Sequence, residues 1–157
     1  ENIFDGEDYI ITPTAKNKPE NIALIEGIVK KLGFGYVARL TPQRHDKMIA
    51  FVSHLPHIIT AAMVLNPIME KENLYIGGSF RDMTRIAHIN SDLWVQLLLD
   101  NSDCVMEHLK VFEDNIHDLK KAISHKDQSR LKFLLAKACK RKESLDLSVD
   151  ARNKSGK

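Results

Sequence analysis

Residues 41–65 read TPQRHDKMIAFVSHLPHIITAAMVL, and this stretch contains the longest apolar periodic run in the sequence. Thr41 followed by Pro42 is typical of a helix start, because the threonine hydroxyl can cap free N–H groups and proline suits the first helical position. Apolar residues then recur at spacings of three and four, which predicts a helix with one buried face. The members of that face are Met48, Ile49, Val52, Leu55, Ile59, Ala62 and Met63.

The middle of this predicted helix carries polar side chains beside a proline. Ser53, His54 and His57 surround Pro56, which has no backbone N–H and is expected to kink the helix. Polar groups in a buried helix cost free energy unless they have partners, so this stretch is a candidate site. We assign His54 the role of a core histidine with its hydrogen bonds satisfied, and His57 a role facing a ligand. The pair lacks an HExxH motif and a third ligand nearby, so we predict no metal site.

Composition limits the class of protein. The 157 residues suffice for one ordinary domain, and the net charge of +2 with dispersed basic residues argues against a nucleic-acid binder. Cys104 and Cys139 lie far apart without CxxC spacing, as expected for reduced thiols of a cytoplasmic protein. We find no signal peptide and expect no apolar run of membrane-spanning length.

The first 40 residues differ from the rest of the chain. Their pattern predicts a strand at 9–12, a helix at 19–32 and a second strand at 36–40. Two strands and one helix do not make a stable sheet alone, so we interpret residues 1–40 as the end of a larger α/β domain. The alternative is a small sheet packed on the helices that follow.

Residues 41–142 are predicted to be entirely helical, which makes the fold class mainly α with a bundle-like helical domain. One helix, expected from residue 101 to residue 123, has apolar positions in a strict seven-residue pattern. That pattern fits either the core of a helical bundle or, in part, a subunit interface. Residues 143–157 are polar and are expected to form a flexible tail. The apolar positions are Val105, Leu109, Phe112, Ile116, Leu119 and Ile123.

A second candidate piece is GGSFRDMTRIA at residues 77–87. Arg81 and Arg85 are four residues apart, so they share one face of a helix that follows a glycine turn. Two guanidinium groups there could bind an anion, and paired N–H groups suit a carboxylate. A solvated charged face is the simpler interpretation of the same run.

These pieces together resemble a known family. HDKMIAFVSHLPH, then GGSFRDMTRIA, then Trp94 is similar to the C-terminal helical domain of prephenate dehydrogenases. ENIFDGEDYIITPT is similar to the segment that leads out of that family's nucleotide-binding domain, which is of the Rossmann type. The resemblance covers roughly residues 1–125 and implies a helical dimerisation and substrate-binding domain preceded by a short β-α-β remnant.

The resemblance also implies roles for individual residues. Arg85 matches the arginine that binds the ring carboxylate of the substrate, and His57 matches a histidine that contacts the other end of the substrate or inhibitory tyrosine. Trp94 matches a tryptophan lining the pocket, and Ser53 a serine near the reacting hydroxyl. Arg81 and Asp82 match a charged pair that helps to close the site.

The implied reaction is the oxidative decarboxylation of prephenate to 4-hydroxyphenylpyruvate with NAD or NADP, in tyrosine biosynthesis. The family's proton-accepting histidine and its dinucleotide fingerprint match nothing in this sequence, which contains no GxGxxG. We therefore expect no catalytic residue, no bound cofactor and no activity in this chain alone, and we expect a homodimer. Two alternatives are the helical domain of another NAD(P)-dependent small-acid dehydrogenase and a non-catalytic helical dimerisation module.

Overall fold

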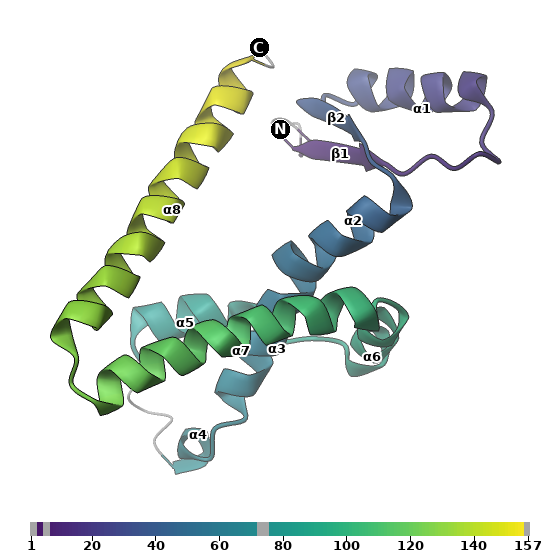
Figure 1. Ribbon diagram of the computed structural model, residues 1–157. Coiled ribbons are helices and arrows are strands. Elements are labelled where there is room, and N and C mark those ends of the chain that lie inside the picture. Colours follow the sequence, from purple (N-terminus) through teal and green to yellow (C-terminus); the bar gives the residue numbers. More distant parts are fainter. Residues whose placement is uncertain (1–2, 5–6, 72–75, 156–157) are drawn as a thin grey trace. The chain divides into compact units, whose positions relative to one another are not determined.

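The structure is a computed structural model that describes residues 3–4, 7–71 and 76–155. Contacts divide the chain into two compact units, which are Glu1–His45 with Asp114–Lys157, and Asp46–Glu113. The described elements are mostly helices, with a pair of strands near the N-terminus (Figure 1). This confirms the expected fold class, which is mainly α after a short β-α-β segment.

The β-α-β segment consists of β1 (Asp8–Ile11), α1 (Pro19–Lys31) and β2 (Tyr36–Arg39). The strands are parallel, with Asp8 opposite Tyr36 and Ile11 opposite Arg39. Pro19 stands in the first turn of α1, and Gly33 follows the helix with a φ of 91°, a conformation that glycine adopts without strain. A two-pronged ion pair from the Arg39 guanidinium to the Glu26 carboxylate ties β2 to α1. It lowers the pKa of Glu26.

The helix predicted at residues 41–65 forms three segments without a break: α2 (Pro42–Ile49), the π-helical segment η1 (Ala50–His54) and α3 (Leu55–Val64). Thr41 caps α2, since its Oγ1 accepts a hydrogen bond of 3.2 Å from the Arg44 N–H. In η1 the Leu55 N–H donates to the Ala50 carbonyl, five residues back. A wider helical turn thus precedes Pro56, which falls in the first turn of α3, where its missing N–H costs little. The disturbance predicted at Pro56 therefore takes the form of a π-helical segment.

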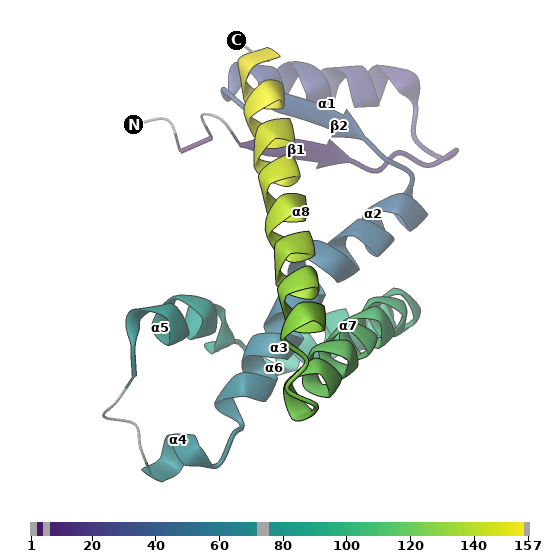
Figure 2. The ribbon, with the colours of Figure 1, turned by 60° about the vertical axis from the view of Figure 1, so that its left-hand side comes forward.

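The chain continues through α4 (Ile68–Lys71), α5 (Gly78–Thr84), the 3₁₀ turn η3 (Arg85–Ala87), α6 (Ser91–Asp100) and α7 (Ser102–Ser124). Figure 2 shows α3, α4, α5, α6 and α7 from a second direction. Within the second unit, α3 packs against both α5 and η3. The capping residue of α6 is Asn90, whose Oδ1 accepts from the Leu93 N–H at 3.2 Å. The residue before α5 is Gly77, which has no side chain to cap the helix.

The end of α2 is fastened to α7 by polar contacts within the second unit. The Lys47 ammonium lies 2.6 Å from a carboxylate oxygen of Glu107. The Asn101 amide donates to the Asp46 carbonyl at 2.8 Å, and His108 Nε2 lies 3.1 Å from the Lys47 carbonyl. These contacts hold the start of α7 beside the helix that carries the candidate histidines.

The last helix, α8, runs from Gln128 to Ser155. Asp127 caps it, accepting from the Arg130 N–H at 2.9 Å. The polar stretch from residue 143, expected to form a tail, is helical through Ser155. An ion pair between Lys142 and Asp146, one turn apart, supports this helix. The domain boundaries at residues 40 and 142 remain predictions.

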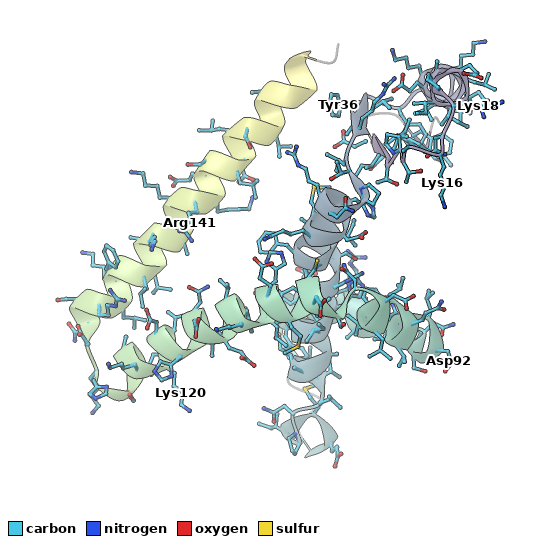
Figure 3. All side chains as sticks on the ribbon, turned by 45° about the vertical axis from the view of Figure 1, so that its right-hand side comes forward. Lys16, Lys18, Tyr36, Asp92, Lys120 and Arg141 are labelled. Carbon is cyan, nitrogen blue, oxygen red and sulfur yellow. The ribbon has the colours of Figure 1, made fainter. Side chains whose placement is uncertain are left out.

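The buried core is small compared with the number of exposed large apolar side chains. Along α7, Val105 is buried, whereas Ile116 is 45% exposed and Ile123 is 61% exposed. Side chains project from much of α7 and α8, as at Lys120 and Arg141 (Figure 3). The apolar side chains of the seven-residue pattern are therefore buried near the start of α7, at Val105, and exposed to solvent toward its end, at Ile116 and Ile123. Among the residues whose burial the structure describes, the buried ones are Val29, Ala50, His54, Leu55, Thr60, Val105 and Ala122.

The expectation that no apolar run reaches the length of a membrane span is wrong. The helix Pro42–Val64 spans 23 residues at a mean hydropathy of 1.4, so by length and composition it could cross a membrane. The core helix of a globular domain passes the same test, and α3 here packs against α5 and η3.

Candidate functional site

The strongest feature of the candidate site is a stack of two rings. His57, in the first turn of α3, lies flat against Trp94 of α6, with ring centroids 3.8 Å apart and planes 28° apart. Both residues are half-buried. The fold thus brings together two of the predicted site residues that are distant in the sequence.

Ser53 joins this pair through its backbone. Its carbonyl oxygen lies 2.8 Å from Nδ1 of His57, which fits an Nδ1–H donating to that oxygen. This bond fixes the ring orientation and leaves Nε2 as the nitrogen available to a ligand. A ring with one fixed nitrogen and one free nitrogen can accept from a hydroxyl or, when protonated, donate to a carboxylate.

His54 completes a cluster of three rings. Its centroid lies 5.9 Å from that of Trp94, with the planes 79° apart, and only 5% of the residue is exposed. Burial, followed by the nearby charge of His57, lowers the pKa of His54, although Asp46 opposes this effect. The prediction that His54 is a core residue is confirmed by its burial. The prediction that its hydrogen bonds are satisfied is wrong, because Nδ1 is buried without a hydrogen-bond partner in the described structure.

The charged residues of the second candidate piece are all exposed. Arg81 and Asp82 belong to α5, and Arg85 begins the tighter turn η3. Among the described residues, no hydrogen bond, ion pair or ring contact links these three to His57 or Trp94. The structure therefore places them in the same unit as the ring cluster without joining them to it.

A cavity of about 480 Å³ lies where α5 faces the end of α3. Its wall is mostly apolar, with Arg81 and His88 as the residues able to carry positive charge. The sequence pattern singled out Arg81 but not His88, which follows the last residue of η3 and belongs to no periodic face. The lining residues are Val64, Met69, Ile76, Phe80, Arg81, Thr84, Ala87 and His88.

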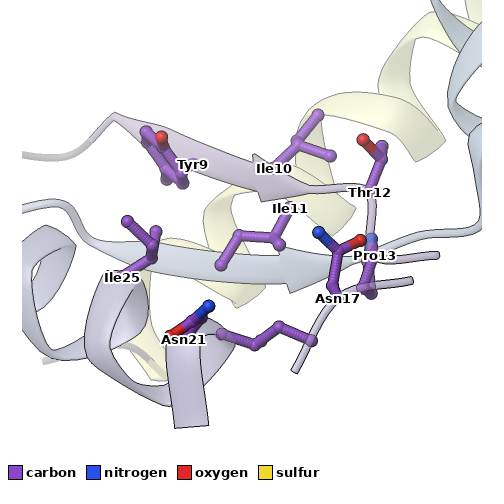
Figure 4. A pocket seen from close by; sticks show the side chains of 9 residues that line it. Tyr9, Ile10, Ile11, Thr12, Pro13, Asn17, Asn21 and Ile25 are labelled. Atoms are coloured by element: carbon purple, nitrogen blue, oxygen red, sulfur yellow. The ribbon is translucent and has the colours of Figure 1, made fainter. Parts of the chain in front are cut away.

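A smaller cavity of about 310 Å³ lies in the β-α-β segment, between the end of β1 and the start of α1 (Figure 4). Tyr9, Ile11 and Ile25 contribute apolar surface, and Asn17 and Asn21 contribute amides. Ligands of open α/β sheets bind beyond the carboxyl ends of strands, which is where this cavity lies. The segment carries no glycine fingerprint, so its residues do not fit a dinucleotide pyrophosphate.

Within the described residues, no three His, Cys, Asp or Glu side chains gather closely enough to hold a metal ion. Cys104 and Cys139 are free thiols.

Comparison with known proteins defines the class. The family described as "Prephenate dehydrogenase, dimerization domain" matches residues 41–137. The prephenate dehydrogenase of Bacillus subtilis is 28% identical over 83% of this chain, and the cyclohexadienyl dehydrogenase of Zymomonas mobilis is 30% identical over 80% of it. This chain spans 36% and 44% of those two proteins, respectively.

A solved structure supports the same assignment. Prephenate dehydrogenase from Aquifex aeolicus, in complex with hydroxyphenyl propionate and NAD+, superposes with a TM-score of 0.81 at 29% identity. The match covers 92% of this chain and 52% of that one. The fold is therefore that of a helical domain from a dehydrogenase. In particular, the chain belongs to the prephenate dehydrogenase dimerization-domain family.

Proposed function

We propose that this chain supplies the substrate pocket and the subunit interface of a prephenate dehydrogenase. The reaction is the oxidative decarboxylation of prephenate to 4-hydroxyphenylpyruvate. The observation that carries the proposal is the His57–Trp94 stack, with His57 tied to the Ser53 carbonyl, inside a domain of this family. An aromatic wall with a nearby imidazole suits a six-membered ring bearing polar groups at its ends.

Each predicted site residue has a role in this proposal. Arg85 holds the ring carboxylate with a forked pair of N–H donors, and Nε2 of His57 binds the other end of the substrate. Trp94 lines the pocket, and Ser53 lies near the reacting hydroxyl. Arg81 and Asp82 form the charged pair that closes the site over the ligand.

NAD or NADP supplies hydride acceptance when bound to the complete enzyme. No residue of this chain is assigned to that cofactor, and the histidine that takes up the hydroxyl proton is not among its residues. The 157-residue chain alone should therefore bind the substrate without reducing NAD+. Measurable turnover by this chain, followed as NADH absorbance, would contradict this division of roles.

The chain acts as a homodimer in the cytoplasm under this proposal. The open end of α7, with Ile116 and Ile123 exposed, offers apolar surface to a second copy. Prephenate and 4-hydroxyphenylpyruvate are the expected small-molecule partners, with tyrosine as an inhibitor.

A binding experiment tests the proposal. Thermal unfolding is measured with prephenate, 4-hydroxyphenylpyruvate and tyrosine in turn. Each should raise the unfolding temperature, since a ligand at a hundred times its Kd stabilises the folded state by about 2.7 kcal/mol. Stabilisation by tyrosine alone would indicate a regulatory binding role, and no stabilisation by any of the three would contradict the proposal.

A wider substrate range is a second candidate. The relative that is 30% identical is a cyclohexadienyl dehydrogenase, a name that covers more than one ring acid. In that case the site would also bind a cyclohexadienyl acid with an amino group in its side chain. Competition of such an acid with prephenate in the same assay would favour this candidate.

A further inference from the structure

We propose that His54 is a positioning residue: its buried ring holds Trp94 in the orientation that keeps His57 stacked and directs His57 Nε2 toward the ligand. The inference rests on the proposed function for the identity of that ligand. It assigns to His54 a role through two other side chains rather than through contact with the substrate.

The geometry of the three rings carries the inference. Trp94 meets His57 face to face at 3.8 Å and His54 nearly at right angles at 5.9 Å. A ring held both by a stacked and by an edge-on neighbour cannot rotate about its side-chain bonds without losing one of the two contacts. Trp94 comes from α6, whereas both histidines come from the η1–α3 border, so the cluster locks α6 onto that border.

Hydrogen bonding through Nδ1 does not account for the place of His54. This atom is buried without a partner in the described structure, although such atoms are normally paired. The unpaired Nδ1 costs free energy, whereas the ring keeps its edge-on contact with Trp94. Phenylalanine, which has a ring of similar shape but no nitrogen, should therefore replace His54 without loss of this role.

The two histidines are three residues apart, a spacing that places both rings on one helix face, and a change of winding lies between them. His54 is the last residue of η1, and His57 lies in the first turn of α3. The change from π-helical to α-helical winding occurs between them, and the Ser53 carbonyl at this border binds the His57 ring. The helix thus fixes His57 from one side, and Trp94, held by His54, fixes it from the other.

Trp94 is the only tryptophan in the sequence, so its fluorescence reports on this cluster alone. The experiment compares His54→Leu and His54→Phe with the unchanged chain, using acrylamide quenching of tryptophan emission and titration with tyrosine. His117→Leu, at an exposed position of α7, serves as the matched control. Far-UV circular dichroism shows whether each variant is folded.

We expect His54→Leu to shift Trp94 emission to longer wavelength, to increase its quenching and to weaken tyrosine binding by roughly threefold to tenfold, as expected for loss of an aromatic contact. His54→Phe should restore all three properties, and the control should alter none. If the leucine variant does not fold, His54→Gln replaces it and is judged by the same criteria.

Two results would overturn the inference. One is a Trp94 signal in His54→Leu that equals that of the unchanged chain. The other is a phenylalanine variant as exposed at Trp94 as the leucine variant. Measurements of emission and quenching require no ligand, so they test the role of His54 even if the unchanged chain does not bind tyrosine. Failure of the unchanged chain to bind tyrosine would contradict the proposed function and not the role of His54.

Discussion

At the scale of single residues, the two histidines of Ser53-His54-Leu55-Pro56-His57 have different surroundings and therefore different chemistry. His57 is half-buried, with one ring nitrogen bound to a carbonyl, which suits a group that meets a ligand. His54 is buried, and its lowered pKa keeps it neutral near pH 7. The two rings lie three residues apart on one helix, and their different burial separates their roles.

The role proposed for Arg85 makes a prediction about ligand selectivity. In the dehydrogenase that carries this domain, Arg85→Ala should weaken prephenate binding by about tenfold to a hundredfold, because charged hydrogen bonds contribute about 1.5–3 kcal/mol. NAD+ binding should change far less. Calorimetric titration of both ligands measures the difference, and Arg130→Ala, which removes an exposed arginine of α8, is the matched control. Equal losses for both ligands would show that Arg85 is structural.

The buried state of His54 predicts how stability depends on pH. Its pKa is lowered in the folded state, so below the ordinary value near 6.5 the unfolded chain binds more protons than the folded chain. The free energy of unfolding should therefore decrease as the pH falls below about 6.5. This loss should continue until the pH passes below the lowered pKa.

Urea unfolding at a series of pH values measures this effect. The decrease should be smaller in His54→Phe, which has no proton to gain, and unaltered in His117→Phe. Identical pH profiles for His54→Phe and the unchanged chain would mean that His54 is not the group responsible.

At the scale of elements, the helix from Pro42 to Val64 shows how one proline changes the winding around it. A proline inside an α-helix removes a hydrogen bond and clashes with the carbonyl four residues earlier. Here the π-helical segment Ala50–His54 precedes it, so that Pro56 stands near the start of α3. The wider turn also brings the Ser53 carbonyl within reach of the His57 ring.

Replacing this proline should affect binding more than stability. Pro56→Ala should change the free energy of unfolding by no more than about 1 kcal/mol, because the π-helical turn already accommodates the proline. It should weaken tyrosine binding, since the recovered N–H permits an α-helical turn that moves the Ser53 carbonyl. Urea unfolding and tyrosine titration test the two parts. A gain of about 3 kcal/mol would instead indicate that the proline is strained in a helix interior.

At the scale of the whole molecule, the exposed apolar residues of α7 and α8 are more than a small globular core usually leaves open. Ile116 and Ile123 continue the same stripe of α7 as the buried Val105. Phe133, Leu135, Leu145 and Leu147 are exposed on α8. The family is described as a dimerization domain, so we expect a second copy of the chain to bind this exposed apolar surface.

The open end of α7 therefore predicts a dimer that depends on its apolar stripe. Light scattering should report a mass about twice 17.9 kDa. Ile123→Asp should weaken association by about thirtyfold, which corresponds to roughly 2 kcal/mol for the loss of one buried isoleucine side chain. Lys120→Ala, at an exposed position on the same helix, makes the net charge more negative by one unit, as Ile123→Asp does, and so controls for the change in charge. A monomeric unchanged chain, or equal weakening by both variants, would contradict the prediction.

The sequence by itself determined the features that obey local rules. Thr41 with Pro42 predicted the start of the long helix, and the pattern of residues 1–40 predicted the strand-helix-strand order. Motif order also indicated the family, and with it His57, Trp94 and Arg85 as candidates. Caps, helical periods and motifs depend on neighbours along the chain, so they can be read without coordinates.

Only the tertiary structure decided which side chains meet. It placed His57 flat on Trp94, buried His54 edge-on to the same ring and put a π-helical turn before Pro56. Among the described residues it formed no hydrogen bond or ion pair between Arg85 and the rings. Such contacts join residues that are distant along the chain, and no local period encodes them. The physical reason is that ring contacts and burial depend on how separate helices pack, whereas a helix start depends on a few consecutive residues.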